Sequence, residues 1–285
     1  MPKHTRIAVV ETVADLRKQV AIWRAAGERV ALVPTMGALH QGHISLVELA
    51  RQHRARVITS IFVNPTQFAP TEDFSQYPRT FDSDCAMLAA AHGDLVFAPS
   101  AKEMYPQGFA TTVTLSGPAK VGLEDAFRPS HFDGVATIVA KLFTQAQPDI
   151  AIFGEKDYQQ LQVVIRMARD LDLGVEVIGA STLREADGLA MSSRNRYLSA
   201  DHRLKARLVP DSLKAAVAAI HAGQAPDAAA RDAAAKLTQA GYGVDYVAVR
   251  HAGTLAPIKG PSDGPSRILV AATIGNTRLI DNMAV

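Results

Sequence analysis

Short, unbroken apolar runs recur over roughly the first 180 residues, and stretches with helical spacing of apolar residues lie between them. Unbroken runs are typical of strands buried on both faces of a parallel sheet. Their alternation with helices is typical of a doubly wound α/β fold. We therefore predict an α/β domain with a doubly wound parallel sheet over residues 1–182. Its predicted strands are 30–33, 57–63, 95–98, 150–153 and 175–178, and its predicted helices are 44–51, 82–91, 135–143 and 159–171.

The composition changes after Leu183, where alanine-rich helical stretches replace the regular alternation. We expect residues 183–285 to form a smaller α+β domain. Pro210 lies inside the first helical stretch, and proline lacks an N–H and clashes with the preceding turn. It is therefore expected to kink that helix or to set its true start. The predicted helices are 204–220 and 228–239, and the predicted strands are 245–249 and 268–273.

The overall composition is that of an ordinary folded protein, with 48% hydrophobic and 20% charged residues. A formal charge of +2 argues against a nucleic-acid partner, because nucleic acids bind strongly basic surfaces. The single cysteine, Cys85, cannot form an internal disulfide, which favours the reducing cytoplasm. We find neither a secretory signal pattern nor a stretch of about 20 apolar residues, so a soluble protein without a membrane partner is expected.

Ligands of open α/β sheets bind beyond the carboxyl ends of the strands, and four such segments carry chemically useful side chains. In the first, VPTMGALHQGH, His40 and His43 lie three apart where a helix is predicted to begin near Gly42. A helix start offers unpaired N–H groups and the positive end of the dipole, so it attracts anions. Two imidazole donors there suit the charge that develops on an α-phosphate as pyrophosphate leaves. A helix-capping histidine pair explains the spacing equally well, and a zinc site is the weakest alternative.

The second segment, SIFVNPTQF, leaves a predicted strand through an Asn-Pro turn. Asn64 and Gln67 carry neutral amides that bind hydroxyl and carboxylate groups without placing a charge beside the reacting atoms. Ordinary turn chemistry is the competing explanation, because Asn-Pro commonly begins a turn.

The third segment, FGEKDYQQL, places Lys156, Asp157 and Gln160 after a strand and a glycine turn. An ammonium there suits triphosphate oxygens and a carboxylate suits ribose hydroxyls, although an exposed charged loop has the same composition.

The fourth segment, READGLAMSSRNRYLS, sets two hydroxyls and a guanidinium side by side at the expected domain junction. Such a loop is able to close over phosphates, and a polar linker is the alternative. The residues concerned are Ser192, Ser193 and Arg194.

Together with AFRPSHFDGVATIV and the terminal TRLIDNM, these segments closely resemble the pantothenate synthetase family of bacteria, nearly from end to end. The HxGH pattern alone marks a wider group of nucleotidylyl transferases, whereas NPxQF with GEKDxxQ and MSSRN is more particular. The resemblance implies a Rossmann-like domain, a smaller C-terminal lid and a homodimer, with ATP and Mg²⁺ carried on its phosphates. The loop PSDGPS and Pro210 depart from the commonest family sequences.

The resemblance also implies roles for individual residues. His40, His43 and Lys156 are the implied catalytic residues, with His43 matching the usual proton donor. Gln67, Gln160 and Asn64 would bind pantoate, and Gln67 would also lie near β-alanine. Glu124 and Arg128 stay candidates without a role. The implied ATP-binding residues are Met36, Gly37, Ala38, Leu39, His40, Gln41, Gly42, His43, Gly154, Glu155, Lys156, Asp157, Leu183, Met191, Ser192, Ser193 and Arg194.

The implied reaction joins pantoate to β-alanine through a pantoyl-adenylate, releasing pyrophosphate and then AMP. No covalent enzyme intermediate is needed, which agrees with a lone Cys85 that has no cationic neighbour in sequence. Two alternatives stay open: an adenylyltransferase of the same fold with another small acceptor, and a catalytically silent nucleotide-binding module. A phosphorylated acceptor favours arginine and lysine where this chain has neutral amides, which counts against the first alternative.

Overall fold

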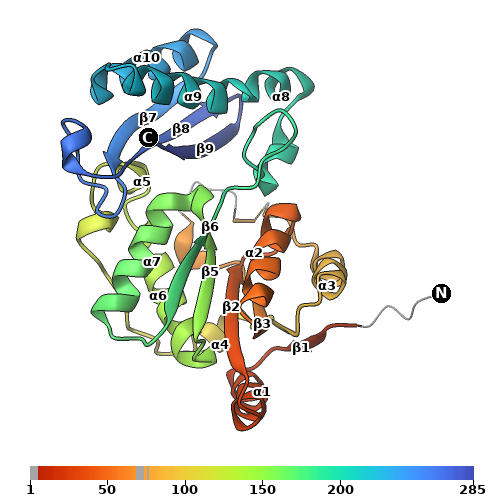
Figure 1. Cartoon of the computed structure of the whole chain (residues 1–285). Helices are drawn as coiled ribbons and strands as arrows, with labels where there is room; N and C mark the ends of the chain where they lie inside the picture. The colour runs from red at the N-terminus through yellow and green to blue at the C-terminus, as the bar shows by residue number, and fades with distance from the viewer. Residues whose placement is uncertain (1–5, 69–73, 76) are drawn as a thin grey trace. The chain divides into compact units, whose positions relative to one another are not determined.

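The computed structural model describes residues 6–68, 74–75 and 77–285, shown in Figure 1. The chain divides into two compact units. The first unit comprises Met1–Leu115, Arg128–Glu155 and Val163–Ser181, and the second comprises Ser116–Phe127, Lys156–Gln162 and Thr182–Val285. Two short segments that precede residue 182 thus belong to the second unit. The expected boundary between residues 182 and 183 stays a prediction.

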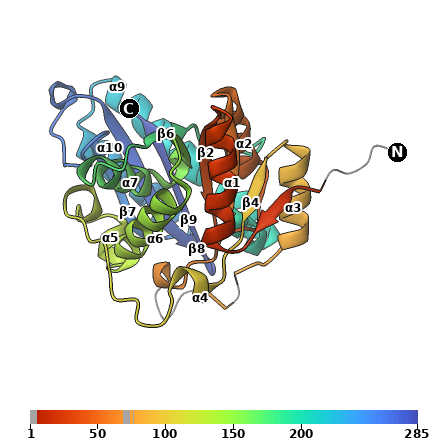
Figure 2. The same ribbon diagram turned by 90° about the horizontal axis from the view of Figure 1, so that it is seen from below.

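The first unit contains a six-stranded parallel sheet in the order β1-β4-β3-β2-β5-β6, which confirms the predicted α/β fold. All five predicted strands lie in it, and Figure 2 shows the additional strand β1 at its edge beside β4. The central strands are buried over almost their whole length, as their unbroken apolar runs indicate. The bounds are Ala8–Val10 (β1), Arg29–Thr35 (β2), Ala55–Ile61 (β3), Leu95–Phe97 (β4), Ile150–Gly154 (β5) and Glu176–Ala180 (β6).

Helices connect these parallel strands. In this unit α1 packs on α6, and α2 packs on α3 and on β5. Apolar side chains of α2, among them Ile44, Val47 and Ala50, join the strand residues in one buried cluster. The bounds are Val13–Ala25 (α1), Gln41–Gln52 (α2), Phe81–Ala90 (α3), Ala101–Met104 (α4), His131–Ala146 (α6) and Tyr158–Asp170 (α7), of which α7 is shared between the units.

The strand order reverses between β2 and β5, which are neighbours although they are far apart in sequence. The register pairs Leu32 with Ala151, so three residues further on Thr35 lies level with Gly154. Both strands end there. Ligands of open α/β sheets bind at such a switch point, and the segments that follow β2 and β5 are two of the four singled out from the sequence.

The second unit contains a three-stranded antiparallel sheet, β7-β8-β9, against which α9 and α10 pack. The single helix expected at 204–220 is two helices that separate at Arg207. Pro210 lies in the first turn of the second helix, where a missing N–H leaves no bond unmade. The bounds are Glu124–Phe127 (α5), Ala200–Ala206 (α8), Leu208–His221 (α9), Pro226–Gln239 (α10), Gly243–His251 (β7), Ser266–Ile274 (β8) and Thr277–Ala284 (β9).

Short 3-10 turns lie at several of the loops that matter below. They are Pro65–Gln67 (η1), Gly117–Ala119 (η2), Glu155–Asp157 (η3), Ser193–Tyr197 (η4) and Pro261–Asp263 (η5). Within the described ranges, every helix is too short or too polar to cross a membrane.

Candidate active site

The turn that follows β2 is held by a buried carboxylate. Gly37 and Ala38 have φ values of 80° and 51°, in the left-handed region, so the chain bends sharply away from the strand. Asp84 of α3 is 1% exposed, and it accepts hydrogen bonds from the backbone N–H groups of Ala38 (3.0 Å) and Leu39 (2.9 Å). A side chain at Gly37 would lie 3.1 Å from the Asp84 carboxylate. This turn carries the predicted ATP-binding residues 36–39.

His40 and His43 cap the N-terminus of α2. The Gly42 N–H donates to Nδ1 of His40 at 3.1 Å, and the His40 N–H donates to Nδ1 of His43 at 3.3 Å. The two ring centroids are 4.1 Å apart. Because each Nδ1 accepts a hydrogen bond, a neutral ring carries its proton on Nε2. The capping explanation and the functional one are therefore compatible, since capping uses the Nδ1 atoms and orients Nε2–H as a donor.

Asn64 is the structural centre of the turn after β3. It is 1% exposed, and its Oδ1 accepts from the hydroxyls of Tyr105 (2.8 Å) and Thr66 (3.0 Å). Its Nδ2 donates to the carbonyl of Gly134 and to Oε1 of Gln67 at 3.0 Å. Turn chemistry thus explains the buried amide of Asn64, and this amide fixes the orientation of the partly buried Gln67 amide.

The backbone of Gln67 is held by the segment RPSHFDG. Its carbonyl accepts from Arg128 at 3.1 Å and lies 3.0 Å from Nδ1 of His131. Gly134 allows α6 to approach this turn closely, since a Cβ there would lie 2.7 Å from the carbonyl carbon of Thr66 and nearer still to its oxygen. Arg128, a candidate without a role at the start, is therefore a support of the Gln67 turn.

The segment GEKDYQQ follows β5. A Cβ at Gly154 would meet no atom within 4 Å, so the backbone faces open space there. In the second unit, Nζ of Lys156 lies 3.8 Å from the exposed carboxylate of Asp157. Gln160 is partly buried in the first turn of α7, whereas its neighbour Gln159 is 3% exposed. These positions leave Lys156, Asp157 and Gln160 reachable by a ligand.

Glu124, the other candidate without a role, is a buried acid of the second unit. It is 7% exposed, and its carboxylate accepts from Arg278 twice, at 2.8 Å each, and from the Tyr246 hydroxyl at 2.8 Å. Its backbone N–H donates to Gln159. Burial, with the neighbouring Glu124 charge, raises the pKa of Tyr246 well above its ordinary value, so that the phenol keeps its proton and donates. Glu124 therefore holds α5 and the start of α7 to the C-terminal sheet.

Leu183 and Met191, both predicted to bind ATP, are brought together. The Met191 N–H donates to the Leu183 carbonyl at 3.0 Å, and Arg184 bridges to Ala190. Ser192 caps the short turn η4 by accepting from the Arg194 N–H at 3.2 Å. The MSSR segment is thus anchored beside Leu183, with Ser192, Ser193 and Arg194 partly exposed.

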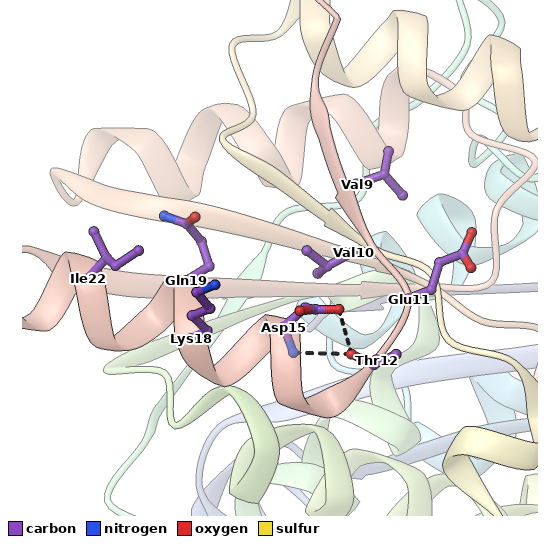
Figure 3. A pocket seen from close by; sticks show the side chains of 8 residues that line it. All are labelled: Val9, Val10, Glu11, Thr12, Asp15, Lys18, Gln19 and Ile22. Carbon is purple, nitrogen blue, oxygen red and sulfur yellow. Dashed lines mark hydrogen bonds between the residues drawn. The ribbon is translucent and has the colours of Figure 1, made fainter.

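A surface cavity of about 490 Å³ lies elsewhere in the first unit, between β1 and the start of α1 (Figure 3). Its lining includes Glu11, Thr12, Asp15 and Lys18, and none of the predicted site residues contributes to it. Within the part of the chain that the structure describes, no three His, Cys, Asp or Glu side chains are grouped to hold a metal ion.

Sequence reasoning missed the residues that hold the site segments in place. Asp84 is an unremarked position inside a predicted helix, and its partners lie 45 and 46 residues earlier. Gly134 did carry a signal, because glycine is unfavourable in a helical pattern and one that occurs there often has a packing reason. Arg278 and Tyr246 carried none, since their contact with Glu124 spans more than 120 residues.

In the first unit, a glycine turn at the switch point and a histidine-capped helix start are typical of α/β proteins that bind nucleotides at the carboxyl ends of their strands. Residues 8–284 match the pantoate-beta-alanine ligase family. A pantothenate synthetase of Bradyrhizobium sp. (strain BTAi1) is 60% identical, and one of Caulobacter vibrioides is 59% identical, each with 97% of this chain and 98% of the relative covered. The chain belongs to the pantoate-beta-alanine ligase family and is a ligase.

Solved structures agree with this assignment. A pantothenate synthetase from Thermus thermophilus is 48% identical and superposes with a TM-score of 0.90 over 97% of this chain and 99% of that one. A pantoate-beta-alanine ligase from Francisella tularensis, solved with beta-gamma ATP and beta-alanine, is 31% identical with a TM-score of 0.81 over 98% and 97% of the two chains.

Proposed function

We propose that this chain condenses pantoate with β-alanine to pantothenate at the expense of ATP. In the first step a pantoate carboxylate oxygen attacks the α-phosphorus, and the bond to the bridging oxygen of the β-phosphate breaks, releasing pyrophosphate. In the second step the neutral amine of β-alanine attacks the acyl carbon of the pantoyl-adenylate. AMP leaves with the electron pair of the acyl–oxygen bond, and the amine loses its proton.

The histidine pair carries this proposal. Two Nε2–H donors side by side at a helix start suit the negative charge that builds on the α-phosphate during the first step. Asp84 accepts from the Ala38 and Leu39 N–H groups and so fixes the turn of Met36, Gly37, Ala38 and Leu39, which leads into this helix start and forms part of the proposed ATP site. Gln41 and Gly42 complete this stretch at the start of α2.

The remaining nucleotide contacts come from two segments. Gly154, Glu155, Lys156 and Asp157 form the turn after β5, in which Lys156 binds phosphate and Asp157 the ribose hydroxyls. In the second segment the backbone of Leu183 binds adenine, Met191 completes the ATP site, and Ser192, Ser193 and Arg194 close over the phosphates.

The acceptor site uses neutral amides. Asn64 donates to Oε1 of Gln67 and so turns the Gln67 amide nitrogen outward as a donor for the pantoate carboxylate. Gln160 binds pantoate from the first turn of α7, and Gln67 also lies beside β-alanine. Asn64 acts by holding Gln67, because its own amide bonds to protein partners.

No nucleophilic side chain takes part. Burial and the nearby Asp84 and Asp82 carboxylates raise the pKa of Cys85, which keeps the thiol protonated. Mg²⁺ is proposed to bind through the ATP phosphates, as it typically does in nucleotide-dependent enzymes. When bound, it neutralises phosphate charge. A homodimer and a cytoplasmic location, expected from the sequence, stay proposals.

ATP–pyrophosphate exchange by the purified chain tests the function. We expect exchange only when pantoate is present, and pantothenate and AMP only after β-alanine is added. Exchange that depends on another acceptor would favour the adenylyltransferase alternative. Folded protein that binds ATP without any exchange would favour the silent module.

Two substitutions test the residue roles within this function. We expect His43→Ala and Lys156→Ala to lower the exchange rate by a factor on the order of 10² to 10³, because each removes a fixed donor to phosphate. The exposed His221→Ala and Lys102→Ala are the matched controls and should keep the wild-type rate. Nearly full turnover of either site variant would remove that residue from the mechanism.

A further inference from the structure

The terminal motif TRLIDNM forms strand β9, and the reaction proposed above gives it no role. β9 lies at the edge of the three-stranded sheet, yet Asp281 and Asn282 are each only 3% exposed. A carboxylate and an amide are costly to bury unless their polar atoms are satisfied by well-placed partners. The partners of these two side chains are therefore informative about what the motif does.

Asp281 binds the segment that begins at Leu183. Its two oxygens accept from NH1 and NH2 of Arg184 at 2.7 and 2.9 Å, a bidentate pair with the Asp281 side chain 2% exposed. Arg184 also donates to the carbonyl of Gly188 at 3.0 Å and so closes the loop between them. The residues before and after this loop, Leu183 and Met191, are hydrogen-bonded to each other. Asp281 thus fixes the segment to which the adenine contact is assigned.

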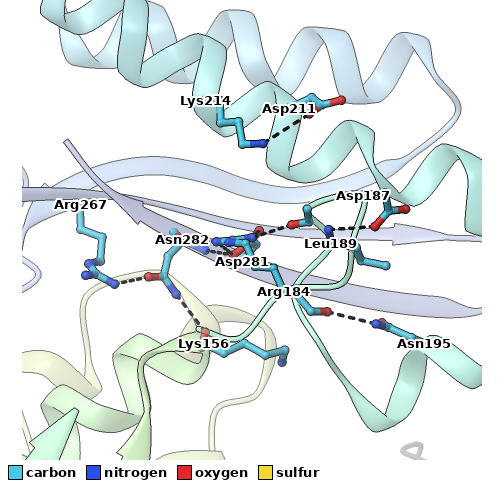
Figure 4. Close-up of polar contacts among 12 residues, drawn as sticks. Lys156, Arg184, Asp187, Leu189, Asn195, Asp211, Lys214, Arg267, Asp281 and Asn282 are labelled. Atoms are coloured by element: carbon cyan, nitrogen blue, oxygen red, sulfur yellow. Dashed lines mark hydrogen bonds and ion pairs between the residues drawn. The ribbon is translucent and has the colours of Figure 1, made fainter. Parts of the chain in front are cut away.

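Asn282 binds the segment that contains Lys156. Its Nδ2 donates to the Lys156 carbonyl at 3.0 Å, and its Oδ1 accepts from Arg267. The Arg267 guanidinium lies over the ring of Tyr158 at 4.0 Å from its centroid. Asn282 therefore contacts Lys156 directly, and it contacts Tyr158 through Arg267. Figure 4 shows Asn282 between Arg267 and Lys156, with Asp281 beside Arg184.

Neighbouring side chains of a strand point to opposite faces, so one dipeptide is able to reach two different loops. We propose that Asp281 and Asn282 are positioning residues for the adenylation step. Asn282 orients the Lys156 turn so that the Lys156 side chain reaches the triphosphate. Asp281 orients the Leu183–Met191 segment so that the Leu183 backbone reaches the adenine. This proposal rests on the function proposed above. Both side chains act through the segments that they hold.

The two residues should affect different kinetic quantities. Lys156 acts on charge that develops in the transition state, so a displaced Lys156 lowers kcat more than it weakens ATP binding. The adenine does not change during the reaction, so a displaced Leu183–Met191 segment weakens binding of ATP itself.

Asn282→Asp is the sharpest variant for the first half of the proposal. The carboxylate keeps the size of the amide and still accepts from Arg267, but it has no N–H to donate to the Lys156 carbonyl. We expect kcat for pantoate-dependent pyrophosphate exchange to fall by about 10², as expected for a misplacement near 1 Å. Asn276→Asp, in the exposed turn of the same hairpin, makes the same chemical change away from these contacts and should keep the wild-type rate.

A double-mutant cycle separates positioning from general structural damage. If Asn282 acts through Lys156, Asn282→Asp should lower the exchange rate of Lys156→Ala by less than about threefold. If the double variant shows the product of the two single-variant reductions in exchange rate, the proposal is overturned. Should Asn282→Asp fail to fold in a thermal melt, Asn282→Ala replaces it in the cycle, since it removes the same hydrogen bond without adding a charge.

Asp281→Asn tests the second half. We expect the Kd for ATP, measured by calorimetry without pantoate, to rise about tenfold, while Asn282→Asp changes it by less than about threefold. An unchanged Kd in folded Asp281→Asn would overturn the assignment of Asp281. The ATP measurement also distinguishes failure of the proposed function from failure of the role given to Asp281. If wild-type protein binds ATP but shows no pantoate-dependent exchange, the proposed function fails. The effect of Asp281→Asn on the Kd for ATP still tests the role of Asp281.

Discussion

The two units use their structural acids in different ways. In the first unit, the buried Asp84 accepts from the backbone N–H groups of Ala38 and Leu39, and the partly exposed Asp149 accepts from that of Val30 at 2.7 Å as well as from Arg24. In the second unit, Glu124 pairs with Arg278, and Asp281 pairs with Arg184. The first kind of contact fixes the backbone of a turn or strand. The second joins one charged side chain to another, and both kinds connect positions far apart in the sequence.

This difference decides what the loss of an acid does. When a carboxylate that accepts from backbone N–H groups becomes an amide, one buried donor is left unsatisfied, which costs about 1–3 kcal/mol. When a carboxylate paired with arginine becomes an amide, a partly buried cation loses its counter-charge, which costs roughly 3–5 kcal/mol in well-buried pairs. The second unit should therefore tolerate loss of an acid less well than the first.

Glu124→Gln should destabilise the fold more than loss of either Asp84 or Asp149. The amide keeps the shape of Glu124, but it leaves Arg278 with only Asp245 as counter-charge and turns an accepting oxygen into a donor. We expect the free energy of unfolding, measured by urea denaturation at pH 7, to fall by roughly 3 kcal/mol. Glu176→Gln, at an exposed position at the start of β6, is the control and should change it by less than about 0.5 kcal/mol. A loss from Glu124→Gln below about 1 kcal/mol would break the comparison.

Asp84→Asn should have an intermediate effect on stability with a local effect on catalysis. One of the Ala38 and Leu39 N–H groups loses its acceptor, so we expect a loss of about 2 kcal/mol in urea denaturation. Because the turn they belong to is assigned to ATP, the pantoate-dependent exchange rate should fall roughly tenfold.

The exposed Asp82→Asn, two residues earlier on the same helix, is the matched control for this substitution. Wild-type exchange by folded Asp84→Asn would mean that the turn keeps its conformation without the carboxylate. A stability loss equal to that of Glu124→Gln would contradict the distinction between the two kinds of acid.

The sequence predicted the elements that bury continuous apolar surface. The strands at 30–33, 57–63, 95–98, 150–153 and 175–178 all lie in the parallel sheet, and the segments that follow β2 and β5 begin at its switch point. The short strand β1 escaped prediction because it has three residues, none of them fully buried. Strand β9 escaped because the buried Asp281 and Asn282 interrupt its apolar pattern.

The supports of the site could not be predicted for a related reason. Motif spacing locates residues that lie close together in the chain, such as His40 and His43, and a helix start fixes their geometry. The contacts of Asp281 with Arg184 and of Asn282 with Lys156 join positions 97 and 126 residues apart. Which of several acids meets which arginine depends on the finished topology. The buried polar pair that hides β9 from sequence analysis is the same pair that holds two of the predicted site segments.

Asp149→Asn should have the smallest effect, and its pH dependence sharpens the comparison. Burial alone would raise the pKa of Asp149, but the hydrogen bonds from the Val30 N–H and from Arg24 outweigh it and hold the pKa below its ordinary value of 3.8. A carboxyl with a lowered pKa stabilises the folded state above its unfolded pKa, and this stabilisation disappears as the pH falls through the folded value. Because Arg24 and Asp149 are partly exposed, we expect Asp149→Asn to lower the free energy of unfolding by only about 1 kcal/mol at pH 7.

Urea denaturation between pH 7 and pH 3 tests this pH dependence. The unfolding free energies of the wild type and of Asp149→Asn should converge below pH 3.8, where the wild-type carboxylate begins to lose its stabilising effect. A difference that stays constant or widens on acidification would mean that Asp149 stabilises β2 through its shape rather than its charge.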